Sequence, residues 1–361
     1  MKIRSVDVIP LQVPFEDGSA GTGLMPTKWT KLDMAIVRIE TTDGVVGWGD
    51  GFAYMCRRAT VAAIEDMVAP LVVGQEIQDI PEFNRHLQQR LHLHGRYGIT
   101  TFAISAIDIA LWDIAAKQAG VPLAELIGGT KRTSLPAYAS LVRYTDPELV
   151  RSFTAKSVSE GYETVKLHEI ALDAIEAGRK GAGDKIKLVT DVNCNWSLEE
   201  THAIMPHMKR LNLYWVEEPV FPPDDAETLG SLQEQYGVAI ASGENACTTV
   251  EFERTAPKIK YIQPSVIKVG GVTEFMKVCD VAEKHGSIVM PHAPYFGPGY
   301  WASVQLMAAR EICEQFEHFY IQPENYLDAD IPLPRDGSVQ VPNKPGIGFE
   351  PDTELLDRYR A

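Results

Sequence analysis

The order of apolar and polar residues divides the chain into two parts with different periodicities. In the first part, apolar runs of strand character lie at 3–9, 34–41 and 45–49, and Thr42-Asp43-Gly44 between the last two favours a β-hairpin. Helical periodicity follows at about 58–70, 81–93 and 100–119, and the last segment is apolar on most faces, as buried helices are. Residues 1–130 are therefore predicted to form an α+β domain.

From residue 131 onward, a strand, a polar loop and a helix alternate repeatedly. A polar or charged residue marks the end of each predicted strand, and successive marks are 21 to 27 residues apart. The marked residues are Ser140, Lys166, Asp191, Glu217, Glu244, Ser265, His292 and Glu317. A near-constant repeat over eight strands is what a parallel α/β barrel requires. We predict such a barrel over residues 131–330, followed by a Pro- and Gly-rich segment at 331–361 that packs back on the first domain.

Three of the marked residues are carboxylates: Asp191, Glu217 and Glu244. They are separated by 26 and 27 residues, and each follows a short apolar run of strand character. The carboxyl ends of parallel barrel strands meet at one face, so the three side chains are expected to converge there. Three hard oxygen ligands without Cys or His suit Mg²⁺ better than Zn²⁺.

The amino-acid composition argues against several classes of binding partner. The net charge of −15 argues against nucleic acid or an anionic membrane surface. The five cysteines include no CxxC pair and fit a reducing cytoplasm. No apolar run approaches the length of a membrane span, and the first residues are interpreted as a strand instead of a signal peptide. We expect a cytoplasmic protein that acts on a small molecule.

Taken together, the motifs resemble the enolase superfamily, in its branch of mandelate racemase and muconate lactonising enzyme. The resemblance rests on the helix SAIDIALWDIAAKQAG, on DVNCNW, WVEEP, SGEN and IKVGG, and on His292, in that order. It implies an α+β capping domain on a (β/α)7β modified TIM barrel, with Mg²⁺ held by Asp191, Glu217 and Glu244. It also implies removal of the proton α to a carboxylate, and assembly into homo-oligomers from dimers to octamers.

Lys166 and His168 in TVKLHEI lie two apart on a strand, so both face the barrel interior. The family usually has Lys-x-Lys here, and His168 replaces the second lysine. A neighbouring ammonium and a nearby Mg²⁺ disfavour an imidazolium, so His168 is expected to be neutral near pH 7 and able to accept a proton. The pattern leaves open whether Lys166 or His168 is the base.

His292 in MPHAP matches the second acid/base of the family, on the opposite face of the substrate. The family has an Asp that orients this His, and Ser265 stands in its place. Without that carboxylate the imidazolium is less favoured, which weakens the case for two-base racemisation. Asn193, Glu317, Ser265 and Trp29 are candidate substrate-binding residues. The loop from Gly18 to Thr30, which carries Trp29, either closes over the site or is a plain surface loop.

The leading hypothesis is an Mg²⁺-dependent lyase that dehydrates a sugar acid to a 2-keto-3-deoxy acid, with Lys166, His168 and His292 as the acid/base groups. The alternatives are a racemase or epimerase, in which His292 opposes the Lys166 and His168 pair, and a cycloisomerase, in which a ring oxygen leaves. A non-catalytic binding protein is the alternative from another class, and the intact acids argue against it.

Overall fold

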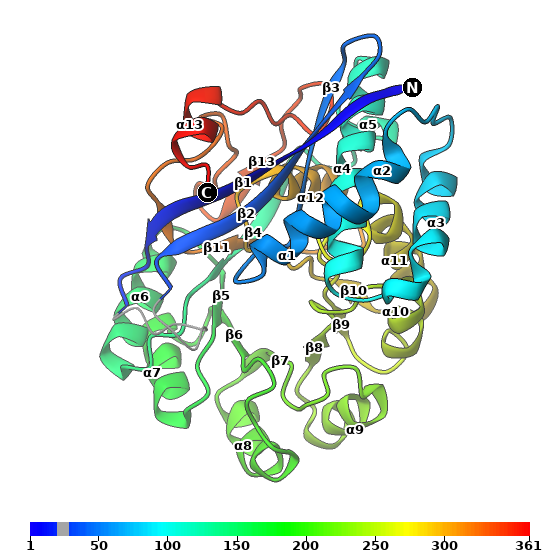
Figure 1. Cartoon of the computed structure of the whole chain (residues 1–361). Helices are drawn as coiled ribbons and strands as arrows, with labels where there is room; N and C mark the ends of the chain where they lie inside the picture. Colours follow the sequence, from blue (N-terminus) through cyan, green and yellow to red (C-terminus); the bar gives the residue numbers. More distant parts are fainter. Residues whose placement is uncertain (20–28) are drawn as a thin grey trace.

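In the computed structural model, which describes residues 1–19 and 29–361, an antiparallel sheet and several helices lie against one side of a parallel barrel (Figure 1). The sheet contains β1 (Ile3–Glu16), β2 (Lys31–Thr41) and β3 (Val46–Gly51). The helical elements that follow are α1 (Arg57–Ala62), the π-helical turn η1 (Ala63–Val68), α2 (Ala69–Val72), α3 (Ile80–Arg90), η2 (His92–His94), α4 (Ile99–Ala119) and α5 (Leu123–Leu126).

Strand β1 continues past the predicted end at residue 9, through Pro10 and Pro14. Gln12 lies between these prolines, and its N–H faces away from β2 and donates to the carbonyl of Tyr359. Side alternation along a strand places the ring nitrogens of both prolines on that same outer side. No hydrogen bond to β2 is lost there, so prolines that suggest a strand end are compatible with its continuation.

Helix α4 is the buried centre of the cap and joins it to the rest of the chain. Its length and composition would allow it to cross a membrane. However, 78% of its most apolar 18-residue stretch is buried inside the protein, so these apolar residues are part of the core. Its two buried acids accept backbone hydrogen bonds from distant segments. Asp108 accepts from the N–H of Thr273 at 2.9 Å, and Asp113 accepts from those of Trp48 at 2.9 Å and Ile347 at 2.8 Å.

The barrel strands are parallel and adjacent in chain order, and the last lies beside the first. They are β4 (Ser134–Ser140), β5 (Thr164–Leu167), β6 (Lys187–Asp191), β7 (Leu213–Glu217), β8 (Ile240–Ser242), β9 (Tyr261–Ile262), β10 (Ile288–Val289) and β11 (Phe316–Phe319). A parallel bridge between Val289 and Cys313 connects β10 to the chain just before β11. The connecting helices are α6 (Pro147–Ser159), α7 (Leu172–Ala182), α8 (Leu198–Arg210), α9 (Ala226–Tyr236), α10 (Thr249–Thr255), α11 (Gly271–His285) and α12 (Pro298–Ala309). This order confirms the predicted (β/α)7β barrel with an α+β cap.

The C-terminal tail contacts both parts of the molecule. Its strand β13 (Ser338–Gln340) pairs antiparallel with β4, a pairing that the sequence did not predict. After β13, helix α13 (Thr353–Arg358) leads to Ala361, whose N–H donates to the carbonyl of Pro10 in β1. Just before the tail, β12 (Gln322–Pro323) pairs with the end of β1. The tail therefore links the barrel to the cap sheet.

Aromatic side chains fill the half of the barrel interior that is farther from the carboxyl ends of the strands. Tyr138, Trp215 and Tyr261 are fully buried and pack with Met290 in one interior cluster. The charged strand-end residues lie nearer the carboxyl ends of the same strands. Because the apolar cluster fills one end of the barrel interior, the polar groups at the carboxyl ends of the strands form the end available for chemistry.

Candidate active site and metal centre

A cavity of about 310 Å³ lies at the carboxyl ends of the barrel strands and is covered by the cap. Its size falls within the range of small-molecule sites. The lining residues are Trp29, Phe52, Tyr54, Ser140, Arg143, His168, Asn193, Asn195, Glu244, Lys268, His292, Pro294, Glu317 and Phe319. Cap and barrel both contribute side chains, so the site is complete only when the two are packed together.

The structure brings Asp191, Glu217 and Glu244 to one point, with one carboxylate oxygen of each within 4.8 Å of the others. Asp191 ends β6, Glu217 ends β7, and Glu244 lies two residues beyond β8. Burial raises the pKa of Asp191. The charge of Lys166 opposes this rise, and the charge of Glu244 adds to it. Burial and then the Asp191 charge raise the pKa of Glu217. The three acids are thus held close together despite their mutual repulsion.

These residues fit a hard divalent cation. Mg²⁺ binds oxygen at about 2.1 Å, which separates neighbouring ligand oxygens by roughly 3 Å and opposite ones by roughly 4 Å. The observed limit of 4.8 Å between the three acids is close to that span. In addition, Oδ2 of Asp191 is buried and accepts no hydrogen bond from the described residues. A buried carboxylate oxygen without a donor has room for a metal bond.

Lys166 is surrounded by carboxylates. Its Nζ lies 2.7 Å from Glu317 Oε1, 3.0 Å from Glu217 Oε1 and 3.6 Å from Asp191 Oδ2. Burial alone would lower the pKa of Lys166, but the charges of Glu217 and Glu317 outweigh it and raise the pKa well above its ordinary value. In this arrangement Lys166 is an ammonium and is not available to accept a proton.

His168 has the opposite character. Its Nδ1 is hydrogen-bonded to the carbonyl of Leu141, and since a carbonyl can only accept, Nδ1 carries the proton. The unprotonated Nε2 lies 3.4 Å from Asp191 Oδ2. Burial first, and the Lys166 charge second, lower the pKa of His168 to about 4. The structure thus presents a neutral imidazole with a free lone pair beside the acid cluster.

His292 lies on the other side of the acids, with Nε2 3.2 Å from Glu244 Oε2. Its Nδ1 has no hydrogen-bond partner among the described residues. Burial and the nearby Lys268 lower the pKa of His292 well below its ordinary value. The hydroxyl of Tyr295 donates to the backbone carbonyl of His292 at 2.8 Å and lies 3.3 Å from Ser265 Oγ. Ser265 does not line the cavity; its hydroxyl contacts Tyr295, and its carbonyl accepts from the N–H of Lys268 at 2.9 Å.

The other residues singled out from the sequence line the cavity. Glu317 accepts from Ser140 Oγ at 2.8 Å and from the N–H of Ala293 at 3.0 Å. Burial would raise the pKa of Glu317, but Lys166 lowers it to about 2, so the carboxylate is ionised. Trp29 stacks on Phe319 with centroids 5.7 Å apart. Residues 20–28, the middle of the loop for which closure over the site and a plain surface position were both left open, lie outside the described residues.

Asn193 sits beside the acid cluster. Its N–H donates to Asp191 Oδ1 at 2.9 Å, and its side-chain oxygen accepts from Arg143 at 3.2 Å. Its φ of 45° lies in the left-handed region, which asparagine tolerates better than most residues. The turn directs the Asn193 side chain into the cavity instead of along the strand.

Two cations in the cavity wall were not identified from the sequence. Arg143 donates to the carbonyl of His168 and to Asn193, and Lys268 donates to Asn245 Oδ1 at 3.0 Å. Neither forms a carboxylate ion pair within the described part of the chain. In a protein of net charge −15, these groups supply local positive charge for an acidic substrate. Lys268 stands in the IKVGG motif, which was noted without a role for its lysine.

Comparison with known families agrees with this geometry. The profile described as mandelate racemase / muconate lactonizing enzyme, N-terminal domain, matches residues 19–128. The profile described as enolase C-terminal domain-like matches residues 149–355. The first match lies in the cap after β1, and the second extends from α6 through the last barrel strand into α13.

Characterised relatives match nearly the full length. L-talarate/galactarate dehydratase of Salmonella typhimurium is 30% identical over 96% of this chain and 87% of its own. Arabinonate dehydratase of Saccharolobus solfataricus is 28% identical over 91% of both chains. The 3,6-anhydro-alpha-L-galactonate cycloisomerase of Streptomyces coelicolor is 28% identical over 97% of this chain and 96% of its own.

Solved structures show the same architecture. A racemase from Streptomyces coelicolor A3(2) with bound magnesium superposes with a TM-score of 0.88 at 25% identity, over 99% of this chain and 100% of that one. The 3,6-anhydro-D-galactonate cycloisomerase from Zobellia galactanivorans superposes with a TM-score of 0.86 at 25% identity, over the full length of both. The relatives thus include both eliminating and isomerising enzymes.

Proposed function

This chain belongs to the enolase superfamily, in the mandelate racemase and muconate lactonizing enzyme family, and from that premise we propose that it dehydrates a sugar acid. The observation that carries the proposal is the position of His168, whose Nε2 lies 3.4 Å from Asp191 Oδ2 beside three converging carboxylates at the mouth of the barrel. The proposed reaction removes the proton α to the substrate carboxylate and expels the β-hydroxyl. The product is a 2-keto-3-deoxy acid.

Asp191, Glu217 and Glu244 are the proposed ligands of Mg²⁺. When bound, Mg²⁺ would supply positive charge where the substrate carboxylate gains negative charge as the α-proton leaves. Lys166 lies 3.0 Å from Glu217 and 2.7 Å from Glu317, and we assign it an electrostatic role at the same place. Its raised pKa supports this role over that of a base.

His168 is the proposed base. The Leu141 carbonyl holds the proton on Nδ1, so Nε2 is the atom that accepts the α-proton. The lowered pKa of about 4 keeps Nε2 free at neutral pH. The electron pair of the broken C–H bond forms the new carbon–carbon double bond, and the carbon–oxygen bond to the β-hydroxyl breaks. The resulting enol then gains a proton at carbon to give the keto acid.

His292 is the proposed acid that protonates the departing hydroxyl. Burial and Lys268 favour its neutral form in the free protein. An anionic substrate placed between His292 and Lys268 would offset the lysine charge and so favour the imidazolium. Arg143, Asn193, Glu317 and Trp29 line the same cavity and would orient the substrate oxygens.

Cycloisomerisation is the second candidate, because relatives of both reaction types match over nearly the whole chain. It uses the same proton removal, with a ring oxygen in place of the hydroxyl as the leaving group. Epimerisation is the third, with His292 as the opposing base. We also propose that the chain forms homo-oligomers, which light scattering on the purified protein tests directly.

The deciding experiment incubates the protein with MgCl₂ and a panel of aldonic, aldaric and anhydro-sugar acids in D₂O, followed by mass spectrometry. Loss of one water from an acid, abolished in His168→Asn, establishes dehydration. Deuterium uptake without loss of water identifies epimerisation instead, and an isomer of unchanged composition from an anhydro acid or lactone identifies cycloisomerisation. Absence of both exchange and product across the panel would contradict the proposal.

A further inference from the structure

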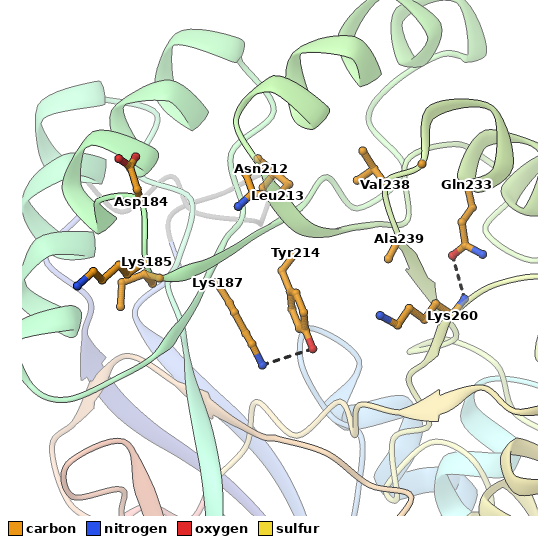
Figure 2. A pocket seen from close by; sticks show the side chains of 12 residues that line it. Asp184, Lys185, Lys187, Asn212, Leu213, Tyr214, Gln233, Val238, Ala239 and Lys260 are labelled. Carbon is orange, nitrogen blue, oxygen red and sulfur yellow. Dashed lines mark hydrogen bonds between the residues drawn. The ribbon is translucent and has the colours of Figure 1, made fainter.

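A second cavity, of about 540 Å³, is shown in Figure 2. It lies where the barrel strands begin, opposite the end that carries the acid cluster. Its walls come from the loops that enter β6, β7, β8 and β9, and the other ends of the first three of these strands carry or precede the proposed ligands. The lining residues are Asp184, Lys185, Ile186, Lys187, Asn212, Leu213, Tyr214, Gln233, Gly237, Val238, Ala239 and Lys260. The proposed reaction makes no use of this cavity.

The cavity is basic although the protein is acidic. Its lining contains Lys185, Lys187 and Lys260 but one acid, Asp184, whereas the whole chain has 49 acidic and 34 basic residues. Among the described residues, no carboxylate lies within salt-bridge distance of Lys185 or Lys260, and Lys187 has Glu314 Oε1 at 3.7 Å. The positive charge of the lining is therefore largely uncompensated.

Two of the ammonium groups converge on one aromatic ring. Nζ of Lys187 lies 4.5 Å and Nζ of Lys260 lies 5.9 Å from the ring centroid of Tyr214, and Lys260 is nearer, at 5.0 Å, to the ring of Tyr261. Figure 2 shows the two lysines approaching Tyr214 from opposite sides, with Lys185 farther out. The ring stabilises each cation, but two like charges beside one ring repel each other. An anion bound in the cavity would reduce that repulsion.

The backbone around these lysines is held in place. Oε1 of Gln233 accepts from the N–H of Lys260 at 2.9 Å and from that of Ile240 at 3.0 Å, which ties helix α9 to the entrances of β8 and β9. Lys187 Nζ is 3.5 Å from the hydroxyl of Tyr214, whose own proton goes to Glu314 at 3.0 Å. The backbone of Lys260 is thus tied to helix α9, and Lys187 is the first residue of β6.

A common explanation for basic residues at this end of a barrel is compensation of helix carboxyl ends. It does not account for these two. Lys187 opens β6 and Lys260 directly precedes β9, and in the part of the chain that the structure describes neither ammonium hydrogen-bonds to a helix carbonyl. Their arrangement needs another explanation.

We propose that this cavity binds a phosphate dianion, either free phosphate or the phosphate group of a small sugar ester. The two charges of the dianion match a lining with three lysines and one acid better than the single charge of a carboxylate does. The cavity is larger than one phosphate ion needs and lies within the size range of organic ligand sites. The side-chain amide of Asn212, which forms no hydrogen bond among the described residues, lines it and can meet a hydroxyl of the ester.

The test measures binding of inorganic phosphate and, separately, of glucose 6-phosphate to the intact protein by isothermal titration calorimetry, with NaCl added to equal ionic strength. The variants are Lys187→Met and Lys260→Met, singly and together, because methionine keeps the aliphatic contact with Tyr214 and removes the charge. Lys180→Met, an exposed lysine on α7 without an ion pair among the described residues, removes the same charge elsewhere. Thermal unfolding of each variant checks that it is folded.

We expect saturable binding that weakens at least tenfold in the double variant and stays unchanged in Lys180→Met. Lys187→Arg with Lys260→Arg, which keeps both charges, should retain it. Glucose 6-phosphate binding at least tenfold tighter than phosphate would mean that the cavity also contacts the sugar, and equal affinities would identify a site for the free ion. Absence of saturable binding by either probe, or equal weakening in Lys180→Met, overturns the proposal.

Discussion

Replacing Glu244 by Gln should make stability depend on Mg²⁺ in a way that separates a metal ligand from a structural acid. Oxygens of Glu244, Asp191 and Glu217 lie within 4.8 Å of one another. At that distance and an effective dielectric constant of 20, two ionised carboxylates repel by about 3 kcal/mol. The nearby Lys166 and partial protonation of Glu217 reduce this, so removing one charge should relieve about 1 to 2 kcal/mol.

The substitution leaves the local contacts largely intact. Asn245 donates to Glu244 Oε1 at 3.0 Å, and a Gln oxygen can accept the same bond. Without metal, Glu244→Gln is therefore expected to be as stable as the unchanged protein or more stable. With Mg²⁺ at a hundredfold excess over its Kd, binding adds about 2.7 kcal/mol to the unchanged protein, and the variant gains little. The order of stability should then reverse.

Urea unfolding in EDTA and in MgCl₂ measures both free energies. Glu234→Gln, which removes a charge from an exposed position on α9, is the matched control and should show the normal Mg²⁺ response. Two results would refute the reasoning. One is a loss of several kcal/mol for Glu244→Gln already in EDTA, as expected of a structural ion pair. The other is equal stabilisation of both proteins by Mg²⁺.

Three further predictions concern single residues. His168→Asn keeps a donor for the Leu141 carbonyl but has no proton acceptor, so we expect α-proton exchange in D₂O to fall by about 10² to 10⁴, with Mg²⁺ affinity retained. Arg143→Gln removes a cation from the cavity wall and should raise KM for acid substrates about tenfold with a smaller change in kcat, and an unchanged KM would remove Arg143 from the binding site. Burial lowers the pKa of His318 to about 4, so the neutral ring favours folding above its unfolded pKa near 6.5, and about 3 kcal/mol is lost as pH falls from there to about 4. Urea unfolding should show a smaller loss over that window in His318→Phe, and an identical pH dependence would contradict the assignment.

The acid cluster could be predicted from the sequence because it depends on a local pattern and one general property of barrels. Asp191, Glu217 and Glu244 follow apolar strand runs at a regular interval, and parallel strands bring their carboxyl ends to one face. The same pattern placed His168 and Glu317 in the cavity. Periodicity was informative here because every one of these side chains is at or near a strand end.

Other features depend on contacts between distant segments, which no local pattern contains. Arg143 and Lys268 lie in irregular chain after β4 and β9, where side-chain direction follows no period. The passage of β1 through Pro10 depends on which side the C-terminal tail occupies.

The electrostatic states of the site also come from tertiary packing. Lys166 and His168 are two residues apart, yet one is held as an ammonium by Glu217 and Glu317 and the other is neutral through burial. The sequence predicts where ionisable groups end their strands, because that follows from local periodicity and barrel topology. Their charge depends on desolvation and on neighbours brought from other strands, and both exist only once the chain is folded.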